Sequence, residues 1–165
     1  MNDRYLFRAK RTDNGEWIKG NLVWSDDTDD DYKAIIIPTT DSNMFTKGGA
    51  RGDLGFENWH RVDPSTICQC TGRTDEDKKL IFEHDIVSYL DTYSTENGYA
   101  ESYCVGEVLW DDETLSFQVT ERLSAESYEV LDGGDDIKVL GNRFDNPELL
   151  LEGKSLASEI IKTCY

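Results

Sequence analysis

The sequence predicts a mainly β protein, with an N-terminal β region, a small C-terminal barrel or sandwich and helices only near the C-terminal end. Short runs of β-branched and aromatic residues are separated by Asn-Gly and Gly-Gly pairs, and helix start signals occur only late in the chain. A composition of 38% hydrophobic and 11% aromatic residues with 3 Pro, over 165 residues, is typical of a folded chain that buries a core. No apolar run has the length of a membrane span or a signal peptide, so we expect a soluble cytoplasmic protein.

The first predicted element is a hairpin of residues 5–12 and 16–24. Its turn contains Asn14 and Gly15, which tolerate the positive φ that a tight hairpin turn requires. We therefore expect the two strands to pair directly with each other.

Two further strands are predicted before the middle of the chain. Residues 34–37 are rich in isoleucine and end at Pro38, and residues 65–70 follow Pro64. Residues 39–58 hold four glycines among polar residues, so we expect an irregular excursion there. Its apolar members are expected to hold it against the core: Met44, Phe45, Leu54 and Phe56.

A charged turn at residues 73–79 is the predicted domain boundary. It separates the N-terminal β region, residues 1–72, from a barrel domain at residues 80–145. A helical tail is predicted at residues 146–165.

The second half carries two hairpin signals and one alternating strand. Asn97-Gly98 predicts a tight turn between long arms, and Gly133-Gly134 predicts a hairpin between the last two strands. Phe117 and Val119 alternate with polar residues, as expected of a strand with one buried face. The predicted strands are residues 86–93, 99–110, 115–120, 128–131 and 137–140.

Two short helices are predicted in the tail. Asn146 can cap free N–H groups, Pro147 suits the first helical position and Glu148 suits the positive end of the helix dipole, while Gly153 ends the helix. A second, amphipathic helix is predicted from four apolar residues at helical spacing: Leu156, Ile160, Ile161 and Cys164.

The charge is distributed unevenly along the chain. There are 17 basic and 34 acidic residues, net -17. Residues 1–25 have five bases and three acids, whereas residues 83–136 have fifteen acids and a single base, Arg122. Strands in that segment must bury one face, so we expect the acids to form a negative outer surface that repels phosphates and attracts basic proteins. The alternative is that this charge only keeps the protein soluble.

The cysteines and histidines predict no metal site. Cys68 and Cys70 lie two residues apart and face the same side of a strand, but no second paired motif exists. Unpaired cytosolic cysteines are usually buried as small hydrophobic residues, and we expect that here. A zinc site would need the remaining scattered thiols and imidazoles: Cys104, Cys164, His60 and His84.

No catalytic or cofactor-binding residues are predicted. Two histidines without a nucleophile motif do not indicate a triad, and acid pairs for glycoside chemistry stay open because their pairing is spatial. The acidic run at residues 26–31 lacks the glycine and terminal glutamate of a calcium loop, and the glycine-rich residues 48–52 lack the rest of a P-loop. The four tryptophans are expected in the core more than in a ligand groove: Trp17, Trp24, Trp59 and Trp110.

Six blocks of the sequence, taken together and in this order, resemble the YopX family of phage and prophage proteins. They span nearly the whole chain, although each block alone is unspecific. The blocks are FRA at residues 7–9, QCTG at 69–72, LIFEHDIV at 80–87, GEVLWD at 106–111, VLGN at 139–142 and NPELL at 146–150.

The resemblance implies an SH3-like barrel in the C-terminal part, a bacterial phage or prophage origin and no known catalytic residues to transfer. Asp85 would open a barrel strand, and Gly106 would allow the bend that closes the barrel. Two positions depart from the family pattern. Cys70 replaces an aromatic residue, which favours a core role, and His84 replaces a glycine, so a turn with positive φ there would strain the histidine.

These observations together predict a non-enzymatic protein-interaction module. Its partner would be a protein, basic if the acidic face is used, or a second copy paired through edge strands. Two alternatives stay open: a DNA mimic that inhibits a host nucleic-acid-binding protein, with its carboxylates in rows, and an uncharacterised hydrolase with its site between the two halves. No direct contact with nucleic acid or membrane is expected.

Overall fold

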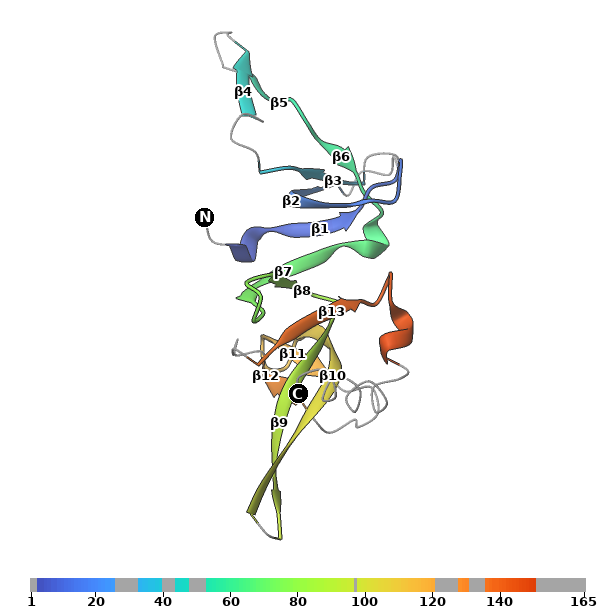
Figure 1. Ribbon diagram of the computed structural model, residues 1–165. Helices are drawn as coiled ribbons and strands as arrows, with labels where there is room; N and C mark the ends of the chain where they lie inside the picture. The colour runs from blue at the N-terminus through green and yellow to red at the C-terminus, as the bar shows by residue number, and fades with distance from the viewer. Residues whose placement is uncertain are drawn as a thin grey trace. The chain divides into compact units, whose positions relative to one another are not determined.

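The computed structural model describes residues 3–25, 33–39, 44–47, 53–96, 98–120, 128–130 and 136–150, and these are mainly β strands in antiparallel sheets (Figure 1). The predicted β class is confirmed. The chain divides into two compact units, Met1–Cys70 and Thr71–Tyr165. The charged turn predicted as the boundary, residues 73–79, lies within the second unit.

The first unit is built on an antiparallel sheet with the strand order β6-β3-β2-β1-β7. A 3-10 helix, η1 (Asp3–Tyr5), precedes it. Its core gathers Ala9, Ala34, Ile36 and Val62, each at most 3% exposed. The strands are β1 (Phe7–Lys10), β2 (Trp17–Trp24), β3 (Ala34–Ile37), β6 (His60–Arg61) and β7 (Cys68–Thr74), which continues into the second unit.

The predicted first hairpin and the strand at residues 34–37 are confirmed. β1 pairs antiparallel with β2 from Phe7↔Gly20 to Lys10↔Trp17. The Arg11 N–H donates to the carbonyl oxygen of Glu16 at 2.9 Å, and Gly15 takes a φ of 73°. Glycine has no Cβ to oppose this conformation, so the Asn-Gly signal predicted the turn correctly.

Two details of the first unit differ from the prediction. The supposed irregular excursion contains a second hairpin, β4 (Met44–Lys47) and β5 (Asp53–Phe56), because its glycines concealed two short strands. The strand predicted at residues 65–70 begins only at Cys68, because Pro64–Thr66 forms a 3-10 helix, η3. Asp63 caps η3: its Oδ1 accepts the Ser65 N–H at 2.9 Å.

The second unit carries a five-stranded antiparallel sheet with the order β12-β11-β10-β9-β13. Ile81, Val87, Val108 and Val119, each at most 1% exposed, form its main core cluster. The elements are β8 (Leu80–Phe82), which lies beside β7, then β9 (Asp85–Thr95), β10 (Gly98–Asp111), β11 (Ser116–Thr120), β12 (Tyr128–Val130), β13 (Lys138–Asn142) and the 3-10 helix η4 (Pro147–Leu150).

The hairpin predicted around the Gly133-Gly134 pair is wrong. β12 pairs with β11, whereas β13 pairs with β9 at the other edge of the sheet. The pairing of β13 with β9 places Val139 beside the fully buried Val87. The burial of this apolar pair therefore decides the strand order, and the local Gly-Gly turn signal does not. The closed SH3-like barrel is not shown either: among the described residues the sheet is open, with β12 and β13 at its two edges.

The predicted helices are seen only in part. η4 begins at Pro147, as the Asn-Pro-Glu signal indicates, but it is a 3-10 helix of four residues. The predicted helix end at Gly153 and the amphipathic helix after it lie outside the described residues, as does the acidic run at 26–31. In the described part of the chain, no helix combines the length and hydrophobicity that crossing a membrane requires.

The turn between β10 and β11 is organised by Asp111. The Thr114 hydroxyl donates to its Oδ2 at 2.6 Å, the Glu113 N–H to its Oδ1 at 3.1 Å, and the Gln118 amide to its Oδ2 at 2.9 Å. These donors, the Thr114 hydroxyl first, favour the carboxylate and lower the pKa of Asp111 below its ordinary 3.8.

We expect Asp111 to make the stability of the second unit depend on acid. Because its folded pKa is depressed, its contribution is complete above the unfolded pKa and is lost as the pH falls through the folded pKa. Urea unfolding of the wild type and Asp111→Asn, compared from neutral pH downward, should show a stability gap that narrows at acid pH. A gap that stays constant or widens would contradict this role.

Candidate functional site

The most distinctive element of the second unit is a long two-stranded arm. β13 pairs with β9 only over Asp85–Ser88, and β11 pairs with β10 only over Glu107–Asp111. Beyond these points β9 and β10 continue as a pair of their own, from Tyr89↔Cys104 to Thr95↔Gly98. We call residues 89–95 and 98–104 the arm, and Figure 1 shows it extending away from the other strands of this sheet.

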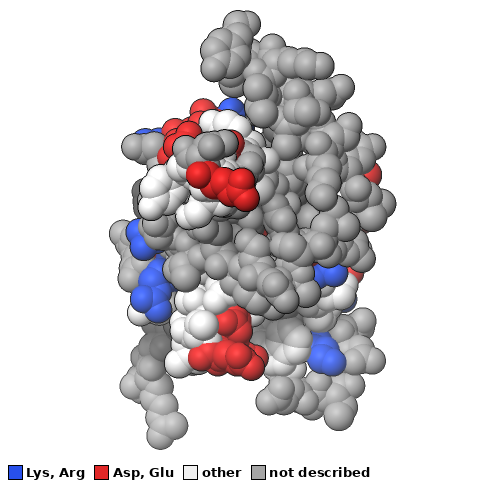
Figure 2. All heavy atoms as spheres, turned by 90° about the horizontal axis from the view of Figure 1, so that it is seen from below, with Lys and Arg blue, Asp and Glu red and all other residues white. Residues whose placement is uncertain are grey.

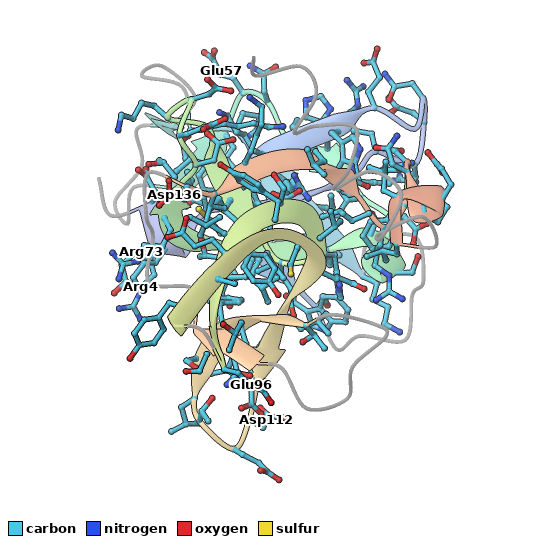
Figure 3. All side chains as sticks on the ribbon, turned by 60° about the horizontal axis from the view of Figure 1, so that its bottom comes forward. Arg4, Glu57, Arg73, Glu96, Asp112 and Asp136 are labelled. Carbon is cyan, nitrogen blue, oxygen red and sulfur yellow. The ribbon has the colours of Figure 1, made fainter. Side chains whose placement is uncertain are left out.

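The exposed side chains described in the arm include tyrosines and carboxylates. Tyr99 is 84% exposed and Tyr103 is 37% exposed. Glu96, in the tip between the strands, and Glu101 are exposed as well. Figure 3 labels Glu96 and Asp112, which lies in the turn after β10, and both are exposed.

No Lys or Arg occurs between Glu83 and Glu121, a stretch that includes the whole arm and the β10–β11 turn. In that turn Asp112 and Glu113 are exposed, beside Trp110 at 44% and Leu115 at 72% exposure. The described carboxylates visible in Figure 2 lie in separate clusters. The arm and turn therefore present negative charge next to large apolar side chains.

A second cluster joins an imidazole, a carboxylate and a guanidinium. His84, in the β8–β9 turn, brings its Nδ1 to 2.8 Å from Glu107 Oε1, and Arg143 Nη1 donates to the same oxygen at 3.0 Å. The Phe144 ring lies edge-on to the imidazole, with the centroids 5.7 Å apart. The exposed fractions of the side chains are 21% for His84, 14% for Glu107 and 47% for Arg143.

This cluster borders an open cavity of about 210 Å³. Glu107 and Arg143 supply its charged wall, and apolar side chains supply much of the rest. The remaining lining residues are Leu109, Thr120, Pro147 and Leu150. No local pattern in the sequence indicates Arg143, because its contact with β10 depends on the path of β13 across the sheet.

His84 occupies the strained turn that the sequence anticipated. Its φ is 64°, in the left-handed region that glycine favours, so the positive φ on which the expected strain depends is confirmed. The turn is held by two backbone bonds: the His84 N–H donates to the Val108 carbonyl at 2.7 Å, and the Arg143 N–H donates to the His84 carbonyl at 3.0 Å.

Two substitutions at this position separate backbone strain from side-chain contact. His84→Gly and His84→Ala both remove the imidazole, but only glycine relieves the strain, so the glycine variant should be the more stable by about 1 kcal/mol. Urea unfolding of the two variants measures this difference directly. Equal stabilities would show that the left-handed backbone carries no cost here.

The cysteines and tryptophans considered in the sequence analysis form no candidate site among the described residues. Cys68 and Cys70 are fully buried, as expected, and no cluster of three or more metal-ligating side chains occurs among the described residues. The expectation of core tryptophans is wrong for Trp24 and Trp59, which are 47% and 43% exposed, and for Trp110. Trp17 lies under a cation, with the Arg8 guanidinium 4.9 Å from its ring centroid.

Comparison with known proteins supplies the family. No match is found among curated proteins. The crystal structure of protein EF1440 from Enterococcus faecalis is similar, with 25% sequence identity, a TM-score of 0.49 and coverage of 87% of this chain and 96% of that one. The family model of YopX protein matches residues 6–151. Since this match covers most of the chain, the protein belongs to the YopX family.

Proposed function

We propose that this protein is a non-enzymatic interaction module that binds a basic protein through the arm and through the β10–β11 turn at the other end of β10. The observation that carries the proposal is the absence of any Lys or Arg from Glu83 to Glu121, where the arm and turn expose their carboxylates. Such a surface raises the encounter rate with a cationic partner and disfavours nucleic acid.

The exposed apolar side chains fit the same role. Trp110, Leu115 and Tyr99 stand beside carboxylates and are between 44% and 84% exposed. Aromatic side chains commonly contribute a large share of the binding energy in protein interfaces, while charge selects the partner. Exposed Trp and Leu beside carboxylates add apolar contact area that charge alone does not supply.

Two predictions from the sequence, the SH3-like fold and the phage or prophage origin, remain part of the proposal. We propose an SH3-like strand arrangement for the second unit, since β9 to β12 follow one another in the sheet and β13 returns to pair with β9. We also propose a phage or prophage origin and action in the bacterial cytoplasm, on the resemblance of the sequence blocks.

The test is capture from bacterial lysate by the full chain and by matched charge variants. Wild type should retain basic proteins at low salt and release them at high salt. The double variant Glu96→Lys and Glu101→Lys should lose them, whereas Glu57→Lys, an exposed acid of the first unit, should not. Retention of the same proteins by all three chains would refute the proposal.

The same capture experiment also tests the DNA-mimic hypothesis, which requires carboxylates arranged in rows. The described carboxylates in Figure 2 lie in separate clusters, so no described feature favours mimicry. A captured nucleic-acid-binding protein that duplex DNA displaces would support it.

One observation favours a second candidate, a hydrolase. His84 Nδ1 lies 2.8 Å from Glu107 Oε1, the contact by which a carboxylate orients a general base, and Glu107 lines the cavity. Against this, no Ser, Cys or Thr side chain is hydrogen-bonded to His84 in the described part of the chain. Hydrolysis of a panel of nitrophenyl esters and phosphates that disappears in His84→Gly would establish an enzyme.

A further inference from the structure

Among the described residues no strand pairs with the β10 edge of the arm, and this edge lacks the lysine, proline and bulge that usually protect one. Natural edge strands are blunted by Lys, Pro or a β-bulge. The segment from Asp85 to Asp111 contains neither Lys nor Pro, and its register runs without a shift from Gly98↔Thr95 to Glu107↔Ile86. A two-stranded ribbon of this kind is only marginally stable in water and gains from a third strand.

We infer that the β10 edge of the arm is a strand-pairing site, to which an extended basic segment of the partner adds as a third strand. This inference rests on the proposed function and names the mode of binding. Main-chain hydrogen bonds would supply affinity along residues 98–104, and the side chains of β10 would select the sequence.

The side chains of β10 define what the added strand must carry. Tyr99, Glu101 and Tyr103 lie at alternate positions and therefore share one face of the arm. An added strand would place one residue opposite each of them. A Lys or Arg opposite Glu101, with apolar residues two positions to either side against the tyrosines, gives a favourable cross-strand pair at each position.

A second copy of this chain does not meet that requirement. Symmetric antiparallel pairing of two β10 edges about Glu101 would set this carboxylate against its own copy, and like charges directly opposite each other are destabilising. The net charge of -17 on each copy adds general repulsion. Because this general repulsion acts in every pairing register, we take the occupant to be a foreign strand with basic character.

Amide hydrogen exchange of the full chain with a synthetic probe tests the inference. The probe is the capped peptide Thr-Val-Thr-Lys-Thr-Val-Thr, and its control replaces Lys by Glu. The Lys peptide should slow exchange within residues 98–104 by at least about tenfold, and the Glu peptide should not. In Glu101→Lys the preference should reverse, while Glu57→Lys should behave as wild type.

A shortened arm provides a second variant if charge reversal disturbs folding. Leu90 and Tyr103 are direct partners, so joining them by Asn-Gly removes the outer arm and leaves the pairing of β9 with β13 and of β10 with β11 untouched. This variant should no longer bind the Lys peptide, while its second unit stays folded.

The inference would be overturned if the Lys peptide failed to bind, or if it bound without protecting residues 98–104. Either outcome leaves the proposed function standing when capture from lysate still depends on salt and on the arm carboxylates. Loss of that dependence refutes the proposed function itself, so the two failures can be told apart.

Discussion

Replacing Asp75 by alanine is expected to lower the free energy of unfolding of the second unit by about 3 kcal/mol. Asp75 is 3% exposed, and its carboxylate accepts three backbone N–H groups: Oδ1 accepts those of Asp77 at 3.0 Å and Lys79 at 2.8 Å, and Oδ2 that of Val139 at 3.2 Å. The side chain thus joins the turn after β7 to the edge strand β13. Alanine leaves all three donors without this acceptor.

Urea unfolding of matched variants checks this result. Asp75→Asn keeps one acceptor oxygen but turns an NH₂ group toward a donor, so it should also destabilise, by less than alanine. Glu76→Ala removes a neighbouring acid that forms a surface ion pair with Lys138. The Glu76 side chain is 39% exposed and that of Lys138 is 48% exposed, so this variant should lose less than about 1 kcal/mol of stability. An alanine variant of Asp75 as stable as that of Glu76 would show that the buried carboxylate contributes nothing.

The second large effect is expected at Gly106, where β10 passes close to β11. A Cβ at this position would lie 2.6 Å from Val119 Cγ1 and 3.0 Å from the Thr120 carbonyl oxygen. Val119 is 1% exposed and cannot move away freely. Gly106→Ala should therefore destabilise the second unit by about 2 kcal/mol through overpacking.

A double-mutant cycle separates this clash from a general cost of alanine in the strand. Val119→Ala alone destabilises by creating a cavity, but it removes the atom that the new methyl group would meet. Gly106→Ala should therefore cost less in the Val119→Ala background than in the wild type. If the two costs are equal, close approach to Val119 is not the reason for glycine at this position.

Local signals in the sequence predicted local structure well. The turn at Asn14-Gly15 and the strand β3 depend on residues within a few positions of each other, where φ and side-chain chemistry decide the conformation. The opening of β9 at Asp85 and the positive φ of His84 were expected from the family resemblance. The short strands β4 and β5 were missed because the surrounding glycines and polar residues weaken the alternation that identifies a strand.

Long-range arrangement could not be predicted in the same way. The return of β13 to β9 brings Arg143 to Glu107, and no periodicity in either segment indicates that meeting. The length of the arm was visible in the sequence as a hairpin with long flanks. That its outer part pairs with no other described strand became clear only from the registers of β11 and β13.

The dependence of partner affinity on salt measures the role of the acidic arm most directly. For the protein captured from lysate, the affinity should fall steeply between about 0.05 M and about 0.5 M salt, because exposed charges are screened over this range. The double variant Glu96→Lys and Glu101→Lys should bind weakly, with a much flatter dependence. An affinity that is insensitive to salt and equal in wild type and variant would contradict an interaction through these carboxylates.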